Sequence, residues 1–305
     1  MLLLFCIILV FFLALVGNST MIYYICLDSH LHTLTYFLLS QLSLMDLKCI
    51  STTVPKMVYN FLSGHKGISF LGCGIQSFLL LTMASSEVLL LASMAYDHYV
   101  AICHPLCYPN LMNRRTCVQM IIASWILGSI NSLAHTVYAL HILYCQGRAI
   151  DHFFCDVPAV LPLACMDTWA YEYTVFVSAS LCLLLPFLGI TAFYGRVLLA
   201  VYHMCSKGGS TKAFTTCSTH LTLVTLYYAP FVYTYLRPRN LCSSAKDEIL
   251  AFFYTILTPM LNPIISSLRN KEVLGGHEKS VWSILFQEKI VMALLIALFF
   301  FPFSR

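Results

Sequence analysis

Charged residues are scarce in this chain. Lys, Arg, Asp and Glu make up 10% of its 305 residues, while 59% of them are hydrophobic. A soluble domain carries about 25% charged residues because its surface must be wetted by water. A chain with less than half of that share cannot cover a globule with polar groups, so much of its surface must face lipid. The composition therefore predicts an integral membrane protein.

The motifs of common enzyme chemistry are also missing. The sequence contains no Gly-rich phosphate loop, no G-x-S-x-G turn and no H-E-x-x-H pair, so we expect that it is not an enzyme. Its net charge of +4 is modest and spread along the chain, so there is no basic face for nucleic acid. Transporters and channels are disfavoured as well, because we find neither inverted repeats nor charged pore-lining residues.

Apolar runs that could cross a bilayer are abundant. A spanning helix needs about 20 mainly apolar residues. Seven runs meet this need, at residues 2–27, 36–62, 73–95, 117–140, 173–202, 213–236 and 249–268. The first run has no basic segment before it and no clear cleavage site after it, which favours a retained span over a signal peptide. The sequence thus predicts an all-α membrane protein with a seven-transmembrane helix bundle.

The long segment between the fourth and fifth runs gives the orientation. Its cysteines are Cys145, Cys155 and Cys165. Disulfides persist outside the cytosol, so we expect this segment to be extracellular, with one of its cysteines bonded to Cys73. The N-terminus is then extracellular and the C-terminus cytoplasmic. Zinc binding by His152 and these cysteines is a lower-ranked interpretation, because C-x-x-C spacing is lacking.

Four phrases between and within the runs are specific. They read LHTLTYF at 31–37, MAYDHYVAICHPL at 94–106, KAFTTCSTHL at 212–221 and PMLNPIISSLRN at 259–270. In this order they closely resemble the vertebrate odorant receptors, a rhodopsin-like family of G-protein-coupled receptors. The resemblance covers most of residues 1–274, which we expect to form the receptor domain. Residues 275–305 are expected to form an atypical tail.

The resemblance implies a function at the plasma membrane. A small hydrophobic odorant would bind among the helices, and a stimulatory G protein of the olfactory type would raise cyclic AMP. Membrane lipids are the remaining expected partner. The expected pocket residues are Leu80, Leu81, Ala84, Ser85, Phe231, Val232 and Tyr235. Packing of helix against helix is the alternative interpretation of these side chains.

Two acids lie inside the spans, where an ionisable group costs a few kcal/mol. They are Asp46 and Glu87. The resemblance implies a sodium ion at this pair, since oxygen ligands suit a hard cation. A hydrogen-bonded cluster without an ion is the alternative, and no other cofactor is expected. The resemblance also implies switch or packing roles for four residues, namely Asn18, His220, Asn262 and Pro263. It further implies two disulfides, Cys73–Cys155 and Cys145–Cys165.

Several positions depart from the family pattern. The coupling motif Asp-Arg-Tyr reads Asp97-His98-Tyr99 here. Arginine is a permanently charged fork with five donors, whereas histidine is shorter and mostly neutral at physiological pH. We therefore expect weaker coupling to the G protein. Lys48 is a further departure, which either finds a carboxylate on another helix or destabilises its span.

The ends of the chain depart as well. The glycosylated tail that precedes the first helix in the family is missing, and a different sequence follows residue 274. The apolar run at 290–303 has 14 residues, which is short for a span and indicates an interfacial segment. Together with His98, these features support an alternative function, a receptor-fold protein with impaired or absent G-protein coupling.

Overall fold

The computed structural model describes residues 2–64, 67–142, 144, 154–155, 160, 163–165, 169–204, 210–235 and 249–268. Six long helices are α1 (Leu2–Leu27), α2 (Leu34–Ser63), α3 (Phe70–Cys103), α5 (Arg114–His141), α7 (Trp169–Met204) and α8 (Ser210–Tyr235). A seventh helical segment is described from residue 249 and passes through the π-helical turn η5 (Phe253–Leu257) into α10 (Thr258–Leu268). Two short elements, η1 (Ser29–Leu31) and α4 (Tyr108–Leu111), lie in the connections. Each of the seven predicted runs is therefore helical in its described part.

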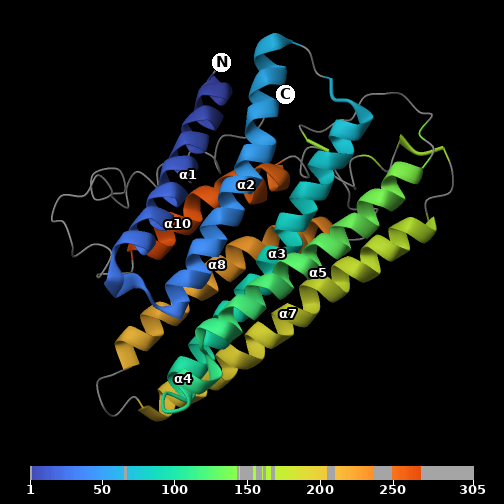
Figure 1. The fold of residues 1–305 in the computed structure, drawn as a ribbon. Coiled ribbons are helices and arrows are strands. Elements are labelled where there is room, and N and C mark those ends of the chain that lie inside the picture. Colours follow the sequence, from blue (N-terminus) through green and yellow to red (C-terminus); the bar gives the residue numbers. More distant parts are fainter. Residues whose placement is uncertain are drawn as a thin grey trace. The chain divides into compact units, whose positions relative to one another are not determined.

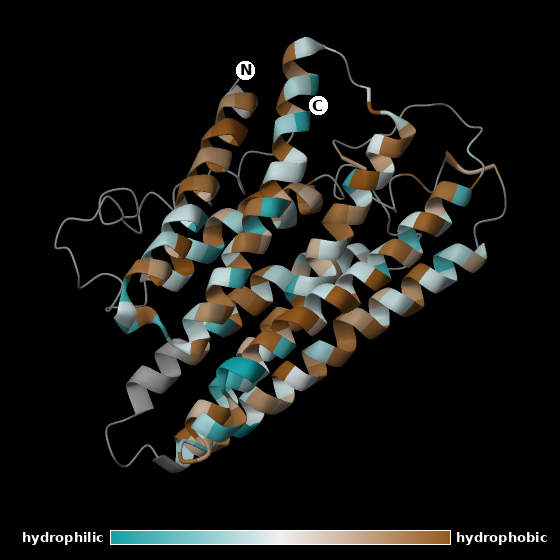
Figure 2. Cartoon of the chain, viewed as in Figure 1, coloured by the Kyte–Doolittle hydropathy of each residue, from teal (hydrophilic) through white to brown (hydrophobic). Residues whose placement is uncertain are grey.

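Five of the described helical segments are long and apolar enough to cross a membrane. They cover residues 4–27, 70–103, 114–141, 169–202 and 249–266. Large apolar side chains such as Ile126 on α5 and Leu188 on α7 are more than half exposed. Figure 2 shows such apolar residues along the length of these helices. An apolar outer surface of this kind is stable in lipid and not in water.

Local sequence sets where the helices begin and end. Asn113 caps α5, since its side chain accepts a hydrogen bond from the backbone N–H of Thr116. α2 ends at Gly64, whose φ of 67° is the left-handed conformation that glycine adopts without strain. α3 continues past Ala95, the predicted end of the third run, to Cys103. Pro105 follows soon after, and the residue before a proline disfavours helical backbone.

The chain divides into two compact units, Met1–Pro263 and Ile264–Arg305, and the packing described here belongs to the first. In it α3 packs against α2, α5 and α7, while α1 packs along α2 (Figure 1). α3 and α5 approach each other closely at Gly128. A Cβ atom there would overlap Ser86 Oγ and lie 2.9 Å from the Ser86 backbone nitrogen. Glycine is thus the residue that permits this approach.

Lys48 has a partner that sequence reasoning did not foresee. Its side chain is on the outside of α2, with Nζ 4.4 Å from the centre of the Trp125 ring on α5. An aromatic face takes the place of the carboxylate that was one of the two predicted outcomes, and the other, destabilisation of the span, stays a prediction. A cation over an aromatic face gains about 0.5–2 kcal/mol. The contact offsets part of the cost of a charge inside a span.

A disulfide joins α3 to the segment that follows α5. Cys73 and Cys155 are bonded, as expected, across 82 positions of sequence. The backbone N–H of Cys155 donates to Gln76 Oε1 at 3.0 Å, which holds the segment against α3. We call this the disulfide end of the bundle, and the opposite end of α3 the Asp97 end.

The other predictions for this segment remain predictions. Cys165 is disulfide-bonded, but Cys145 lies outside the described residues, so the pair Cys145–Cys165 is untested. His152 and the whole of 275–305, including the run at 290–303, also lie outside the described residues.

Candidate functional site

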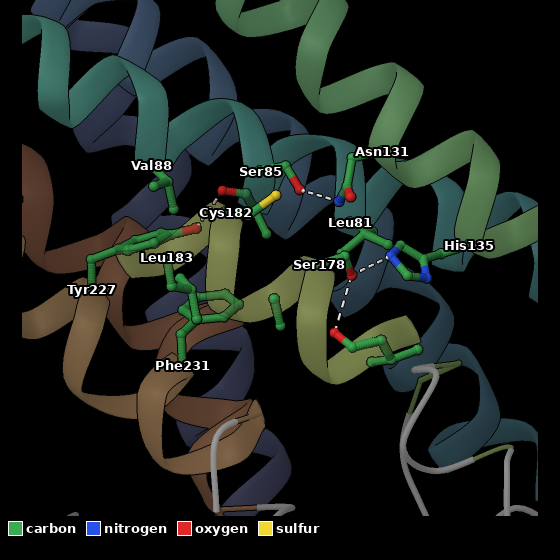
Figure 3. Close-up of a pocket in the computed structure, with 13 residues that line it drawn as sticks. Leu81, Ser85, Val88, Asn131, His135, Ser178, Cys182, Leu183, Tyr227 and Phe231 are labelled. Atoms are coloured by element: carbon green, nitrogen blue, oxygen red, sulfur yellow. Dashed lines mark hydrogen bonds between the residues drawn. The ribbon is translucent and has the colours of Figure 1, made fainter. Parts of the chain in front are cut away.

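A cavity lies between four helices of the bundle. Its empty space is about 560 Å³, a figure that includes the part open to solvent. α3 contributes Leu81, Ala84, Ser85 and Val88 to its wall. α5 contributes Asn131 and His135; α7 contributes Val175, Ser178, Ala179, Cys182 and Leu183; α8 contributes Tyr227 and Phe231. Figure 3 shows Tyr227 and Phe231 on one side of the cavity and Asn131 and His135 on the other.

One polar pair in the wall joins α5 to α3. Asn131 Nδ2 donates to Ser85 Oγ at 3.0 Å (Figure 3). Ser85 therefore acts as an acceptor toward Asn131. Among the described residues, no hydrogen bond uses the hydroxyl proton of Ser85 or the second amide hydrogen of Asn131. Both remain available as donors.

A second polar pair joins α5 to α7. Ser178 Oγ donates to the carbonyl of Val175 at 3.0 Å, and His135 Nε2 lies 2.7 Å from the same Oγ. A hydroxyl has one proton to give, so both contacts are satisfied together when His135 Nε2 carries a hydrogen and donates to Ser178 Oγ. The Nε2–H tautomer of a neutral His135 is therefore the one that fits this pair of contacts.

The opposite wall is aromatic. The hydroxyl of Tyr227 donates to the carbonyl of Ala84 at 2.6 Å, which ties α8 to α3. The Tyr227 ring stacks on Phe231 with centroids 4.7 Å apart, and Phe231 contacts Tyr254 at 4.6 Å. A ligand that pushes on this wall would press directly on α8.

The predicted pocket residues divide into three groups. Leu81, Ala84, Ser85 and Phe231 line this cavity. Leu80 lines a second cavity, Val232 is 39% exposed and lines neither, and the side chain of Tyr235 lies outside the described part.

Sequence reasoning missed the α5 and α7 walls. A usable signal existed on both helices, because polar or polarizable residues recur there four positions apart within apolar runs. These pairs are Asn131 with His135 and Ser178 with Cys182. Residues four apart share one face of a helix, and polar side chains inside a span face the bundle interior.

The second cavity leads toward the acid pair. Its empty space is about 450 Å³, again counting the part open to solvent, and it shares Leu81, Ala84, Tyr227 and Phe231 with the first cavity. Glu87 lines its wall. The two cavities are therefore neighbours that share the aromatic wall.

The acids lie within one polar cluster of the core. Asp46 is 1% exposed, and Asn262 Nδ2 donates to its two carboxylate oxygens at 3.1 and 3.0 Å. Glu87 interacts with the same amide. Asn18 Nδ2 donates to the carbonyl of Pro259 at 2.8 Å, while its buried Oδ1 accepts no hydrogen bond from any described residue. Asn262 therefore joins the two acids, Asp46 and Glu87, in one cluster. Asn18 binds the backbone of the same helix at Pro259.

At the Asp97 end, the carboxylate of Asp97 is fully buried and engaged by neutral donors. Thr35 Oγ1 donates to Oδ2 at 2.5 Å, and the hydroxyl of Tyr108 donates to Oδ1 at 2.8 Å. Tyr108 lies in the short helix α4, outside the spans. Burial and the neighbouring carboxylate raise the pKa of Tyr108 above its ordinary value, so that it keeps the proton it donates.

His98 occupies the position where a long cation was expected. Its Nδ1 lies 4.0 Å from Asp97 Oδ2, and its ring contacts the ring of His220 edge-on at 5.3 Å. The hydroxyl of Tyr194 is 2.8 Å from His220 Nδ1, which extends the network to α7. Tyr99, the third residue of the motif, is within hydrogen-bonding distance of His104. His98 is 7% exposed and packs inward.

A bundle of seven membrane helices, with an apolar cavity among them and a polar network at one end of α3, has the architecture of the rhodopsin-like receptors. The sequence model described as "Olfactory receptor" matches residues 5–286. The chain belongs to the olfactory receptor family of G-protein-coupled receptors.

Individual relatives agree with this assignment. The chain is 74% identical over 273 residues to human olfactory receptor 2L13, covering 90% of this chain and 88% of the relative. It is 67% identical over 270 residues to human olfactory receptor 2L3, covering 88% and 86%. It is 49% identical over 298 residues to human olfactory receptor 2M2, covering 97% and 86%. The protein is therefore a multi-pass membrane receptor and not an enzyme, and family membership implies odorant ligands and coupling to a heterotrimeric G protein.

Proposed function

We propose that this receptor binds small volatile odorants in the cavity between α3, α5, α7 and α8, and that it signals through a stimulatory G protein of the olfactory type to raise cyclic AMP. The observation that carries the proposal is the lining of the cavity. None of its 13 lining residues is an Asp, Glu, Lys or Arg, and most of them are apolar. Such a wall suits small, uncharged, weakly polar molecules.

In this proposal the disulfide end faces the outside of the cell. A disulfide forms and persists outside the cytosol, and Cys155 is bonded at that end. The Asp97 end then faces the cytoplasm, where the G protein binds. The N-terminus is extracellular and the C-terminus cytoplasmic.

The aromatic wall connects ligand binding to the Asp97 end. Tyr227 and Phe231 lie on α8, which carries Pro230 between them and His220 further along. A proline inside a helix removes a backbone hydrogen bond and provides a point of bending. A ligand that displaces Tyr227 from the Ala84 carbonyl would let α8 swing and separate His220 from His98. That movement would open the Asp97 end.

The test is a cyclic AMP assay in transfected cells, with surface staining in parallel. A panel of neutral volatile compounds should raise cyclic AMP in cells that display the receptor, and Phe231→Ala should weaken that response. A receptor that reaches the surface and gives no cyclic AMP response to any odorant would contradict the signalling proposal.

A second function is favoured by one specific observation, the buried His98. Asp97 accepts hydrogen bonds from two neutral donors, and residue 98 is a histidine. The chain therefore has no arginine at this position that could leave Asp97 and contact a G protein. We infer that coupling is impaired relative to receptors with arginine at this position. His98→Arg should then increase the maximal cyclic AMP response at equal surface level. Equal responses from the unchanged chain and from His98→Arg would reject this second function.

We also propose a sodium ion at the acid pair. Two buried carboxylates would repel each other if both were ionised, so the cluster needs either a cation or a proton. The residues that would hold the ion are Asp46 and Glu87, with the unpartnered Asn18 Oδ1 as a further oxygen. Bound sodium would supply positive charge that stabilises both carboxylates in the inactive packing.

The alternative, a protonated packing cluster, makes a different prediction. Sodium chloride should raise the melting temperature of the purified receptor more than choline chloride at equal ionic strength. Glu87→Gln should remove that difference. An equal effect of the two salts would leave the cluster without an ion.

A further inference from the structure

We propose that the cavity selects neutral odorants that carry a hydrogen-bond-accepting oxygen, which Ser85 and Asn131 bind. Ketones, aldehydes, esters and alcohols share this oxygen. The proposal rests on the proposed function, since it assumes that odorants occupy this cavity. It goes further because it assigns the chemical class of the ligand and the two residues that bind the ligand oxygen.

The lining argues against charged ligands. A carboxylate or an ammonium group that entered the cavity would lose its hydration and find no side chain of opposite permanent charge among the lining residues. The imidazole of His135 is not a permanent charge, because histidine is mostly neutral at physiological pH, and its Nε2 is hydrogen-bonded to Ser178. Fatty acids and amines are therefore poor ligands for this wall.

The hydrogen-bond inventory argues for an oxygen acceptor. Asn131 donates one amide hydrogen to Ser85, which leaves the hydroxyl proton of Ser85 and the second amide hydrogen of Asn131 without an acceptor among the described residues. The other polar groups of the wall are engaged. Tyr227 donates to the Ala84 carbonyl and Ser178 donates to the Val175 carbonyl. The surplus of donors lies at the pair Ser85 and Asn131.

A pure hydrocarbon would leave these two donors without an acceptor. An apolar ligand that covers a donor removes its hydrogen bond to water and offers no acceptor in exchange, which costs free energy that an oxygenated ligand avoids. The apolar body of the ligand would pack on Leu183, Tyr227 and Phe231. The cavity thus has one polar locus and one apolar wall.

Binding is measured on the full chain, purified in lipid nanodiscs, as a shift of its melting temperature. The probes are hexan-2-one, octan-2-one and decan-2-one, with octane, octanoate and octylamine as matched compounds. At least one ketone should raise the melting temperature, and should do so at concentrations at least tenfold lower than the matched compounds. Ser85→Ala should weaken ketone binding about tenfold, the loss expected for one hydrogen bond to a buried donor.

Two further variants separate a local effect from misfolding. Ser85→Thr keeps the hydroxyl and should restore most of the affinity. Ser93→Ala is the matched control, since Ser93 lies on the same helix, donates to the Leu89 carbonyl and lines neither cavity. It should leave ketone binding unchanged.

The outcomes separate this inference from the proposed function. Binding of octane, octanoate or octylamine as tight as that of the ketones would overturn the inference, as would equal ketone affinity in Ser85→Ala. So would no shift with any ketone. Ketone binding without cyclic AMP would support the ligand class and contradict the signalling, whereas a cyclic AMP response confined to acids or amines would do the reverse.

Discussion

The middle of α3 and its Asp97 end satisfy their polar groups in different ways. In the middle, beside the cavity, Ser85 and Asn131 form one hydrogen bond and keep two donors unused. At the Asp97 end, Asp97 has no exposed surface, and each of its carboxylate oxygens accepts a hydrogen bond. The same helix thus has one region with unused hydrogen-bond donors and another region in which both oxygens of the carboxylate are hydrogen-bonded.

This difference separates recognition from stability. Spare donors next to a cavity cost little in the empty receptor, because the space admits water or a ligand. A buried carboxylate that lost a donor would have no replacement, so its partners are expected to matter for folding. Substitutions should therefore lower stability at the Asp97 end and ligand affinity at the cavity.

The largest effect is expected where α3 and α5 touch. Gly128→Ala would place a Cβ against the Ser86 backbone, so the helices would have to move apart. Overpacking of this kind costs about 1–3 kcal/mol and would also separate Ser85 from Asn131. We expect little receptor at the cell surface and no ketone binding. Gly189→Ala is the control, because a Cβ at Gly189 meets no atom within 4 Å, and normal surface level is expected for it.

The next effect tests the Asp97 end. Tyr108→Phe removes one of the two donors to a buried carboxylate, which should cost about 1–3 kcal/mol. The melting temperature of the purified receptor should fall clearly. Tyr23→Phe, on an exposed ring of α1, gives the comparison for loss of a tyrosine hydroxyl. An unchanged melting temperature in Tyr108→Phe would show that Asp97 does not need the hydrogen bond from Tyr108 for stability.

A smaller effect is expected at Lys48 and Trp125. A double-mutant cycle of Lys48→Met and Trp125→Leu should give a coupling free energy of about 0.5–2 kcal/mol, the range for a cation over an aromatic face. Lys48→Met alone should raise the surface level, because it removes a charge from the span. Additive effects of the two substitutions would mean that the contact contributes nothing.

The smallest effect is expected for stability at the cavity. Ser85→Ala should change the free energy of unfolding by less than about 0.5 kcal/mol, since it deletes an acceptor beside open space. Thermal melting without ligand measures this. A loss of unfolding free energy as large as that of Tyr108→Phe would mean that the cavity region and the Asp97 end do not differ in this way.

The sequence predicted the seven helices because an apolar run of about 20 residues matches the thickness of a bilayer when it is helical. It also predicted the disulfide between Cys73 and Cys155, which the structure contains. Four of the residues that it assigned to an odorant pocket line the first cavity, namely Leu81, Ala84, Ser85 and Phe231, and their role in odorant binding stays a prediction. The helices follow from the length of the hydrophobic runs, and the disulfide follows from the resemblance.

What the sequence did not reveal depends on contacts between helices. The donors to Asp97 come from Thr35 and Tyr108, in two different elements, and no spacing indicates that they meet. The contact of Lys48 with Trp125 was missed for the same reason, since Trp125 lies on another helix and a carboxylate was the partner considered. α3 also continues beyond residue 95, the end of the predicted run, and Asp97 and His98 are buried inside it.

The π-helical turn at Phe253–Leu257 affects how this helix would respond to the loss of a single residue. A π-turn holds one more residue than an α-helical turn, so removing a residue there would convert it to regular helix. Each residue advances a regular helix by about 100°, and the wide turn takes up this rotation, so the two halves keep the orientation that they would have without the extra residue. Tyr254 contacts Phe231 on one side of this turn, and Asn262 holds Asp46 on the other. A single-residue deletion at this turn that spares Tyr254 should therefore keep both contacts, whereas a deletion in the regular helix between the turn and Asn262 would rotate one contact away from its partner.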